Sequence, residues 1–392
     1  MFDYYSEAKA LQGFLTERRR DLHQHPELPL EEFRTAQVLE QQLDELNIPH
    51  QRIGATGVLG ILKGELPGSG VIALRADIDA LPIQEANEVS YRSVNDNVMH
   101  ACGHDAHTTC LLGGVKILAA HRSEFGGEVR IIFQPAEEIG RGADDFISAG
   151  VMDGVQRVFG LHTAHEIPAG TVSLTPGLNN AGVDQFKILI HGKGAHVSTP
   201  ELGSDAVYIG SHIVTALQAL VTRRTSPVEA ALIGVGTFNA GTAYNVVAEE
   251  AELIGTTRTI TEETQMRFRK EITETSQRIA ALYGATAEVI WTPISALLYN
   301  NASVCDEAIA ALTPGMPGVN FMQERPFSLG GDNMADYLHC APGAYAYLGS
   351  GNDALPGTLN AAHNCRFDID ESVLPIGAAL YAGYAAWWLE QG

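Results

Sequence analysis

The spacing of apolar positions over roughly the first 180 residues predicts a domain in which helices and strands alternate. Apolar residues recur every three or four positions over 8–22 and 31–46, with Pro26 between them, which predicts two amphipathic helices. The further expected elements are helices over 105–120 and 143–149 and strands over 57–62, 71–77, 128–133 and 158–162. Because such alternation usually builds a sheet covered on both faces, we expect an α/β domain with a mixed, mainly parallel sheet.

From about residue 181 the pattern changes to a different order of elements. The expected elements are strands over 185–191, 230–235, 251–259 and 287–291 and helices over 204–223 and 262–282. A β-α-β-β-α-β order of this kind is typical of a small ferredoxin-like α+β domain. A chain of 392 residues exceeds one ordinary domain, so we expect a discontinuous α/β domain over 1–181 and 294–392 and an inserted domain over 182–293.

The composition limits which binding partners and which cell compartment we expect for this protein. A formal net charge of −22 argues against nucleic acid and anionic membrane surfaces as partners, because phosphate groups are bound by basic surfaces. The chain has no run of about 18 apolar residues, and its first residues carry neither the basic nor the apolar segment of a signal peptide. Five widely spaced cysteines, an odd number, favour reduced thiols, so we expect a cytoplasmic protein with no membrane association.

The richest group of metal-binding side chains lies in the segment 99–108, which reads MHACGHDAHT. Cys102 and His104 are two residues apart, so in an extended segment their side chains would point the same way. A thiolate with an imidazole suits a late first-row divalent metal better than calcium or magnesium. Alone, such a pair is more often a buried thiol near a surface histidine, so the rest of the chain decides between the two interpretations.

Polar residues follow three of the predicted strands. They are Asp77 and Asp79, then Glu137 and Glu138, then His162, and in open α/β sheets ligands bind at the carboxyl ends of strands. Taken singly, the Glu pair is typical of a solvated turn and His162 of a core histidine. Two of them, Glu138 and His162, join three other donors as candidate metal ligands. The five candidates are Cys102, His104, Glu138, His162 and, far downstream, His363. Five donors suit two ions that share a bridging water, and Glu137 could then face that water as general base.

Six longer motifs resemble the metal-dependent amidohydrolases that cleave N-acyl amino acids. The motifs are RRDLHQHPEL at 19–28, RADIDALPI at 75–83, MHACGHDAHT at 99–108, FQPAEE at 133–138, GLH at 160–162 and GKGAH at 192–196. This family includes bacterial hippurate and N-acetyl-amino-acid hydrolases and plant auxin–amino acid conjugate hydrolases. The resemblance extends over nearly the whole chain.

The resemblance implies two divalent ions per chain on those five candidate ligands, with Glu137 as general base. Manganese or zinc is the expected metal, and cobalt or nickel would also fit the donors. It implies that the inserted domain is a lid that also joins two chains into a homodimer, or into a higher oligomer. His196 resembles the histidine that steadies the oxyanion, in its own or the partner's site. Asn245 and Arg258 resemble groups that hold the substrate carboxylate.

Three short segments depart from the family. Tyr244, in GTAYN at 241–245, stands where relatives tend to have histidine, and Cys365 stands where a proline usually follows the last ligand. The segment 330–334 reads GGDNM where relatives tend to have Gly-x-Glu-Asp-Phe, so that Asp332 and Asn333 replace Glu and Asp. We expect these changes to fall at or near the substrate pocket rather than on the metal ligands.

The expected reaction is hydrolysis of the amide bond of N-acetyl, benzoyl or indole-acetyl L-amino acids, giving a carboxylic acid and a free amino acid. The first alternative is a dipeptidase or carboxypeptidase on the same scaffold. A second is thiol catalysis by Cys102 with His104 as base, although neighbours two apart make poor nucleophile–base geometry. A third is a metal-stabilised dimer that binds N-acyl amino acids without cleaving them, for which Glu137 would have no use.

Overall fold

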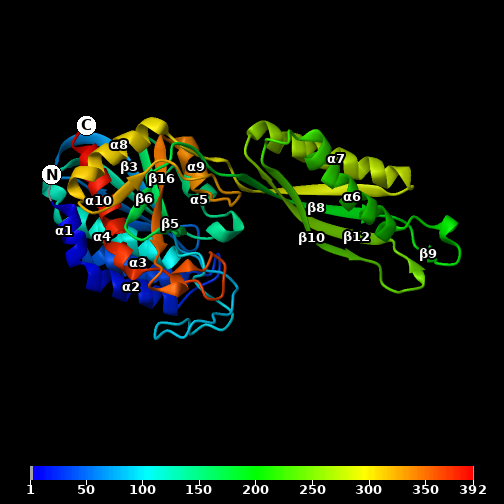
Figure 1. The fold of residues 1–392 in the computed structure, drawn as a ribbon, viewed down its shortest axis with the longest axis horizontal. Helices are drawn as coiled ribbons and strands as arrows, with labels where there is room; N and C mark the ends of the chain where they lie inside the picture. Colours follow the sequence, from blue (N-terminus) through cyan, green and yellow to red (C-terminus); the bar gives the residue numbers. More distant parts are fainter. Residues whose placement is uncertain (1–2, 392) are drawn as a thin grey trace. The chain divides into compact units, whose positions relative to one another are not determined.

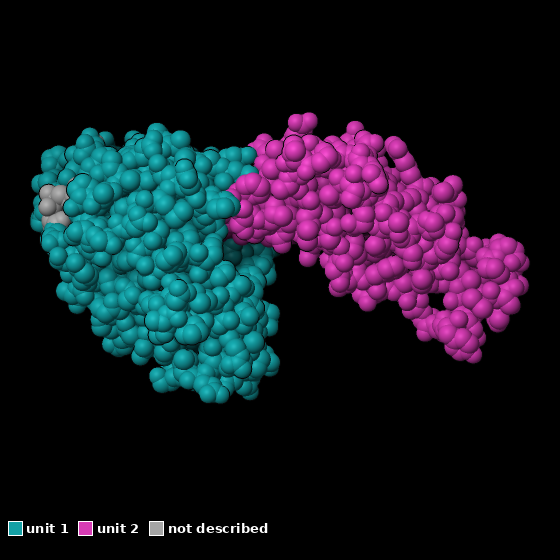
Figure 2. Space-filling view, in the orientation of Figure 1, with its two compact units in different colours: residues 1–179, 299–326, 333–392 teal, residues 180–298, 327–332 magenta. Residues whose placement is uncertain are grey.

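The computed structural model describes residues 3–391, which form two compact units (Figure 1, Figure 2). Unit 1 contains Met1–Asn179, Tyr299–Pro326 and Asn333–Gly392, and unit 2 contains Asn180–Leu298 and Phe327–Asp332. Unit 2 therefore extends beyond the inserted range 182–293 expected from the sequence. It also takes in 327–332, which the sequence pattern assigned to the α/β domain.

Unit 1 is built on an eight-stranded sheet in the order β1-β2-β4-β3-β5-β16-β6-β15. Its strands are β1 (His50–Ile53), β2 (Gly57–Lys63), β3 (Leu66–Asp77), β4 (Gly126–Gln134), β5 (Arg157–Pro168), β6 (Thr171–Ser173), β15 (Asn320–Met322) and β16 (Gly343–Gly351). The four central strands, β4, β3, β5 and β16, are parallel, whereas β1 and β2 are antiparallel additions at one edge. The predicted mixed, mainly parallel sheet is confirmed.

Helices complete unit 1: α1 (Tyr4–Ala10), α2 (Gln12–Gln24), α3 (Phe33–Glu45), α4 (His104–Ala120), α5 (Ala143–Ser148), α8 (Ala302–Leu312), α9 (Met334–Cys340) and α10 (Leu374–Leu389). Helices α4 and α10 pack against each other and are buried on nearly every side, as expected of helices that are apolar all round. They approach closely at Gly114, which has no side chain. A Cβ at this position would meet the Cβ of Tyr381 at 2.7 Å. This packing fixes α4, whose first residue is His104.

Unit 2 is a ferredoxin-like sandwich with an antiparallel sheet in the order β10-β12-β8-β13. Its elements are β8 (Gly182–His191), α6 (Ala206–Arg224), β10 (Ala231–Ala240), β12 (Glu250–Thr259), α7 (Glu262–Leu282) and β13 (Thr286–Ser295). Phe186, Ile188, Ile190 and Leu253 are buried under α6 and α7, so the alternate residues of β8 and β12 face away from the helices. The predicted β-α-β-β-α-β order is confirmed.

Two short strand pairs complete the described sheets. In unit 2, β9 (Ala195–His196) pairs with β11 (Val246–Val247) to form a small ribbon. The other pair joins β7 (Gly177–Asn180) to β14 (Leu298–Asn300), where the chain passes into and out of unit 2.

No helix between residues 3 and 391 has both the length and the apolar composition needed to cross a bilayer. All five cysteines are free thiols, and Cys102 is among the buried ones. Cys102 is therefore available to bind a ligand other than another cysteine.

Candidate metal centre

Cys102 and His104 converge through a tight turn at the start of α4. Gly103 between them has φ 90°, in the left-handed region, and a Cβ there would meet Oγ1 of Thr163 at 2.4 Å, so only glycine fits. The expectation that an extended segment would align the two side chains is therefore wrong, although the two donors do come together. Position 103 needs both backbone freedom and a missing side chain.

Glu137 and Glu138 lie in a short 3-10 helix, η2 (Glu137–Ile139), just after β4. Ala136 before them has φ 57°, and its N–H donates to the carboxylate of the buried Glu32 at 2.9 Å. This bond stabilises the unfavourable left-handed backbone conformation of Ala136. The direction in which the chain continues from β4 into Glu137 and Glu138 is therefore fixed.

His162 lies inside a strand, not at its end. The sequence pattern placed the end of the strand at His162, but β5 continues to Pro168 because β16 runs alongside it, with Tyr347 opposite His162. His162 Nδ1–H donates to the backbone oxygen of Thr163 at 2.6 Å, and Nε2 lies 3.5 Å from Sγ of Cys102. The ring therefore directs Nε2 toward the thiol.

His363 reaches the same place from a loop that follows the 3-10 helix η5 (Pro356–Leu359). Its backbone has φ 67°, and its N–H donates to the oxygen of Ala101 at 2.7 Å. The side chain is half-exposed, and its Nε2 lies 3.4 Å from Oε1 of Glu138. The backbone bond to Ala101 brings this loop to the turn that carries Cys102.

These donors form overlapping groups whose ligand atoms all lie within 4.8 Å of one another. The first group is Cys102, His104 and His162, and the second is Cys102, Glu138 and His363. A third consists of His104, Glu137 and Glu138. Because Cys102 belongs to the first two groups, the arrangement can hold two ions that share it.

A fourth group, Asp77 with His104 and His107, also has the spacing of a metal site, but His107 has no free nitrogen to bind a metal. The backbone N–H of Thr163 donates to Nε2 of His107 at 2.9 Å, so the proton of that ring is on Nδ1. Nδ1–H then donates to Oδ1 of Asp77 at 2.7 Å. Both nitrogens of His107 are occupied, and we therefore regard His107 as a support for Asp77.

Two buried atoms at the centre are poised to bind a cation. Nε2 of His104 and Oε1 of Glu138 are both buried without a hydrogen-bond partner among residues 3–391. An unsatisfied buried polar group costs about 1–3 kcal/mol, and these two lie 3.7 Å apart. Since Nδ1–H of His104 donates to the oxygen of Asp79, the Nε2 of the neutral ring carries a lone pair directed at the carboxylate. Lone pairs that face one another fit a divalent metal.

The neighbouring acidic and basic groups shift the pKa values of Cys102 and His104. Burial and the neighbouring Glu138 carboxylate raise the pKa of the Cys102 thiol. Burial would lower the pKa of His104, but Asp77 and Asp79 raise it well above its ordinary value. A divalent cation reverses both tendencies, because a coordinating thiol is deprotonated and a coordinating imidazole is neutral.

Asp79 orients two of the candidate ligands at once. Its backbone oxygen and Oδ1 lie 2.9 and 3.2 Å from Nδ1 of His104. Its Oδ2 accepts the backbone N–H of Glu138 at 3.0 Å. Carboxylates that fix ligand histidines in this way are typical supports of metal sites.

Asn333 lies in a buried polar network. Its Oδ1 accepts from Nη2 of Arg75 at 3.1 Å and from Nε2 of Gln134 at 2.8 Å, and its Nδ2–H donates to the oxygen of Arg141. Arg75 also donates to Oδ2 of Asp77 at 2.7 Å. The expectation that the change at this position falls at or near the substrate pocket stays a prediction, and no sequence signal linked residues as distant along the chain as Gln134 and Asn333.

His196 and Asn245 lie together in unit 2. His196 is in β9 opposite Val246, and the N–H of Val197 donates to the oxygen of Asn245 at 3.1 Å. The backbone N–H of Ser198 donates to Nδ1 of His196 at 3.1 Å, so the proton of the neutral ring is on Nε2. The exposed ring therefore has Nε2–H available as a donor.

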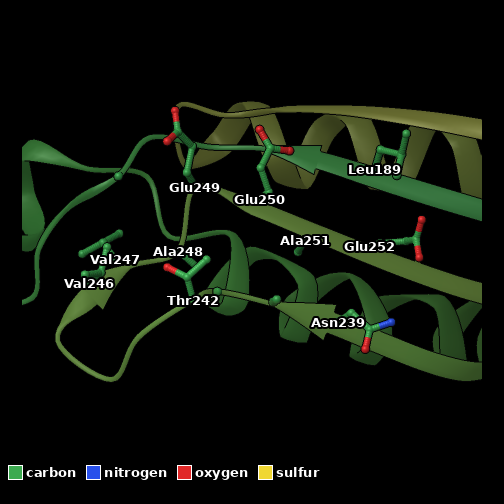
Figure 3. A pocket seen from close by; sticks show the side chains of 13 residues that line it. Leu189, Asn239, Thr242, Val246, Val247, Ala248, Glu249, Glu250, Ala251 and Glu252 are labelled. Carbon is green, nitrogen blue, oxygen red and sulfur yellow. The ribbon is translucent and has the colours of Figure 1, made fainter.

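A hollow of about 480 Å³ lies beside this ribbon (Figure 3). It is lined by Thr242 and Val247 on one side and by Glu249, Glu250 and Glu252 on the other. Neither His196 nor Asn245 lines it. The carboxylates of Glu250 and Glu252 are paired with His191 and Lys187 at 2.7 and 3.2 Å, so this hollow offers no unpaired acidic cluster.

Arg258 lies at the other end of the unit 2 sheet. It pairs with Val183 in β8, close to the point at which the chain enters unit 2, whereas the ribbon adjoins the end where Glu250 pairs with His191. Eight residues of antiparallel strand separate the two ends, a span of roughly 27 Å. Arg258 has no hydrogen bond or ion pair within the described residues, and burial lowers its pKa.

Known proteins are similar to this chain in sequence and in fold. The sequence profile described as Peptidase family M20/M25/M40 matches residues 73–387. The chain belongs to this family. A Bacillus subtilis protein described as a dinuclear metal binding peptidase of family M20 has a similar structure, with TM-score 0.81 and 34% identity over 97% of this chain and 99% of that one.

Two curated relatives carry different names. The chain is 37% identical to N-acetylcysteine deacetylase of Bacillus subtilis, over 97% of this chain and 98% of the relative. It is 36% identical to thermostable carboxypeptidase 2 of Saccharolobus solfataricus, over 96% of each. The chain is therefore a metal-dependent amidohydrolase.

Proposed function

We propose that the chain hydrolyses the amide bond of N-acyl L-amino acids with two divalent metal ions, releasing a carboxylic acid and a free amino acid. The observation that carries the proposal is a pair of buried atoms without a hydrogen bond among residues 3–391, Nε2 of His104 and Oε1 of Glu138, beside a second carboxylate. That second carboxylate, Glu137, lies 3.9 Å from Nε2 of His104. A purely structural metal site has no need of it.

Each ion has its own set of ligands in this proposal. Cys102, His104 and His162 would hold the first ion, and Cys102, Glu138 and His363 would hold the second. Thiolate, imidazole and carboxylate together fit zinc, and the mixed nitrogen and oxygen donors also accommodate manganese, cobalt or nickel. Of these, manganese and zinc are our expectation.

Glu137 acts as general base and then as general acid. Bound divalent ions lower the pKa of a water molecule and polarise the amide carbonyl. Glu137 accepts the proton of the attacking water and delivers it to the leaving amine. His196 donates Nε2–H to the oxygen on which negative charge develops, a contribution of about 3 kcal/mol in comparable sites.

Arg258 binds the carboxylate of the substrate. A half-buried guanidinium with no counter-ion among the described residues is unusual, and a carboxylate is the anion that its planar fork fits best. Arg258 alternates with the buried Thr257 and Thr259, so it lies on the sheet face opposite α6 and α7. A substrate can therefore reach it without displacing the helices.

His196 and Asn245 act on a substrate bound by a second copy of the chain. An N-acyl amino acid is far shorter than the roughly 27 Å that separates Arg258 from the ribbon carrying these two residues. Arg258 and His196 of one chain therefore cannot contact the same substrate molecule. A homodimer that exchanges the ribbons, with the inserted unit as lid, would supply both groups to each site.

The carboxypeptidase relative favours a second candidate, hydrolysis of peptides from the carboxyl end. Both reactions need the free carboxylate that Arg258 would bind, so they differ only in the acyl half. We rank N-acyl amino acids first because two of the three carboxylates that line the hollow beside the ribbon, Glu250 and Glu252, are already paired, which leaves Glu249 alone to recognise a free amine.

The test is product formation from a panel of N-acetyl, N-benzoyl and indole-acetyl amino acids and dipeptides, measured by mass spectrometry. The protein would be stripped of metal and reconstituted with manganese, zinc, cobalt or nickel, with Glu137→Gln as control. Metal-dependent release of amino acids from acylated substrates, lost in the control, is expected. Cleavage of dipeptides alone would select the peptidase, and activity that survives metal removal would contradict both candidates.

A further inference from the structure

Arg19 is a buried cation that joins distant parts of the chain. It lies in α2 and is completely buried. Its Nε donates to Oδ2 of Asp105 at 2.9 Å, and its Nη2 lies 2.9 Å from Oδ1 of Asp368. A third carboxylate, Glu371, lies 3.4 Å from Nη1. Arg19 belongs to the family-like motif at 19–28, and neither the metal centre nor the proposed reaction uses it directly.

The two nearest carboxylates belong to the two segments that carry the candidate ligands. Asp105 directly follows His104 in the first turn of α4. Asp368 lies five residues after His363, at the end of the loop that carries that histidine. One guanidinium therefore links the turn that carries Cys102 and His104 to the loop that carries His363.

The loop of His363 needs such support. A non-glycine residue at φ 67° is held only where the surrounding structure over-determines it. No side-chain hydrogen bond of the His363 ring fixes the loop from within, since its nearest described contact is the carboxylate of Glu138. The loop is instead tied at its far end by three bonds from one neighbouring segment: Ala86 N–H to Cys365 O, Asn87 Nδ2–H to Phe367 O and Tyr91 Oη–H to Asp368 Oδ2.

We propose that Arg19 is a positioning residue that sets the affinity of the second metal ion, by fixing the His363 loop against the segment that carries Cys102 and His104. The inference rests on the proposed function, because it takes His363 as a ligand. It goes beyond that function in assigning a role to a residue that touches neither metal nor substrate.

The geometry requires an arginine at this position. Two carboxylates on different segments are contacted by different nitrogens of one planar group, which the single ammonium of lysine cannot reproduce. Arg20 is a matched control, since it contacts the same Glu371 at 2.6 Å and lies over the ring of Tyr91 at 4.6 Å, as Arg19 does at 5.1 Å. It is 44% exposed and has no described contact with Asp105 or Asp368.

The experiment compares Arg19→Lys and Asp368→Ala with Arg20→Lys and the unaltered protein. Manganese or zinc is titrated into metal-depleted protein, stepwise Kd values are measured by calorimetry, and bound metal is counted by elemental analysis after dialysis. We expect the second Kd to rise about tenfold or more in both test variants, the range found when groups supporting a ligand are removed. The first Kd should stay within about threefold of the native value, since Cys102, His104 and His162 remain in place. Activity at saturating metal should return to the native level.

The outcomes separate the inference from the proposed function. An unchanged second Kd in both variants, or an equal loss of both ions, would overturn the role of Arg19. The same weakening in Arg20→Lys would also overturn it, because the effect would then come from surface charge. If unaltered protein binds two ions but cleaves no amide, the proposed reaction fails while the inference still stands. Asp368→Ala provides a second test in case Arg19→Lys does not fold. It removes the contact of Arg19 with the His363 loop but leaves Arg19 paired with Asp105.

Discussion

Asp79 contacts one nitrogen of His104 twice, through its backbone oxygen at 2.9 Å and through Oδ1 at 3.2 Å. The double contact fixes both the tautomer and the direction of the ring, so that Nε2 faces the carboxylate of Glu138. The remaining oxygen of Asp79 accepts the N–H of Glu138. One residue that is not a ligand therefore places two candidate ligands.

We expect Asp79→Asn to weaken metal binding by about 10- to 100-fold. The amide keeps one oxygen, but its NH₂ group can then face either the N–H of Glu138 or the N–H of His104, and two donors repel. Metal titration of the depleted protein measures the loss. Asp44→Asn is the matched control, since Asp44 also contacts a histidine, His50, at 3.0 Å on the surface. Equal affinities for the two variants would contradict the role of Asp79.

Substitution by Gln should have different effects on activity and metal content at Glu137 and at Glu138. Glu137→Gln removes the proposed base and should lower kcat by about 10²- to 10⁴-fold while leaving metal content unchanged. Glu138→Gln removes a ligand and should lower metal content first. Elemental analysis and kcat, measured on the same preparations, distinguish the two. Loss of metal in Glu137→Gln would show that Glu137 is a ligand rather than the base.

Local signals in the sequence were sufficient for regular elements. The helix expected over 262–282 matches α7 (Glu262–Leu282), because Thr261 caps its first turn and Gly284 follows its end. The helix expected over 8–22 is divided at Leu11 into α1 and α2, since a regular apolar spacing does not reveal a short break.

Features set by partners distant in sequence could not be predicted in this way. The true end of β5 depends on β16, so the sequence pattern misplaced His162 relative to the strand end. The convergence of Cys102 and His104 depends on the left-handed turn at Gly103, which is held against Thr163. The separation of His196 from Arg258 follows from the register of β12 and β8, which no single motif contains.

Mixed dimers test whether His196 acts across the subunit boundary. Glu137→Gln and His196→Ala should each be nearly inactive as homodimers. In a mixed dimer that exchanges ribbons, one of the two sites receives a native Glu137 and a native His196, so random mixing should restore about a quarter of native activity. Activity after subunit exchange, compared with the unmixed variants, is the measurement. No recovery, with mixed dimers confirmed by mass spectrometry, would place His196 in its own chain's site.

His23 should make stability depend on pH. Its completely buried ring lies with Nδ1 2.7 Å from Asp105 and Nε2 3.2 Å from Glu85, so both nitrogens face carboxylates. Burial and the nearby Arg19 lower the pKa of His23, but Asp105 and Glu85 outweigh them and raise it above 6.5. A raised pKa in the folded state means that protonation of His23 stabilises the fold. This contribution is complete below about pH 6.5, the value in the unfolded chain, and is lost as the pH rises through the folded value.

We therefore expect His23→Gln to lower the free energy of unfolding by about 2 kcal/mol more at pH 6 than at pH 9, the size of hydrogen bonds to charged groups. His25→Gln is the control, because its ring is half-exposed and its Nδ1 lies 2.8 Å from the backbone oxygen of Asp21. Urea unfolding of both variants and the unaltered protein at the two pH values gives the differences. The comparison with His25→Gln removes effects of pH on metal binding that all three proteins share. A penalty for His23→Gln that is the same at both pH values would mean that the buried ring is neutral, since only a charged imidazole gains stability from both carboxylates.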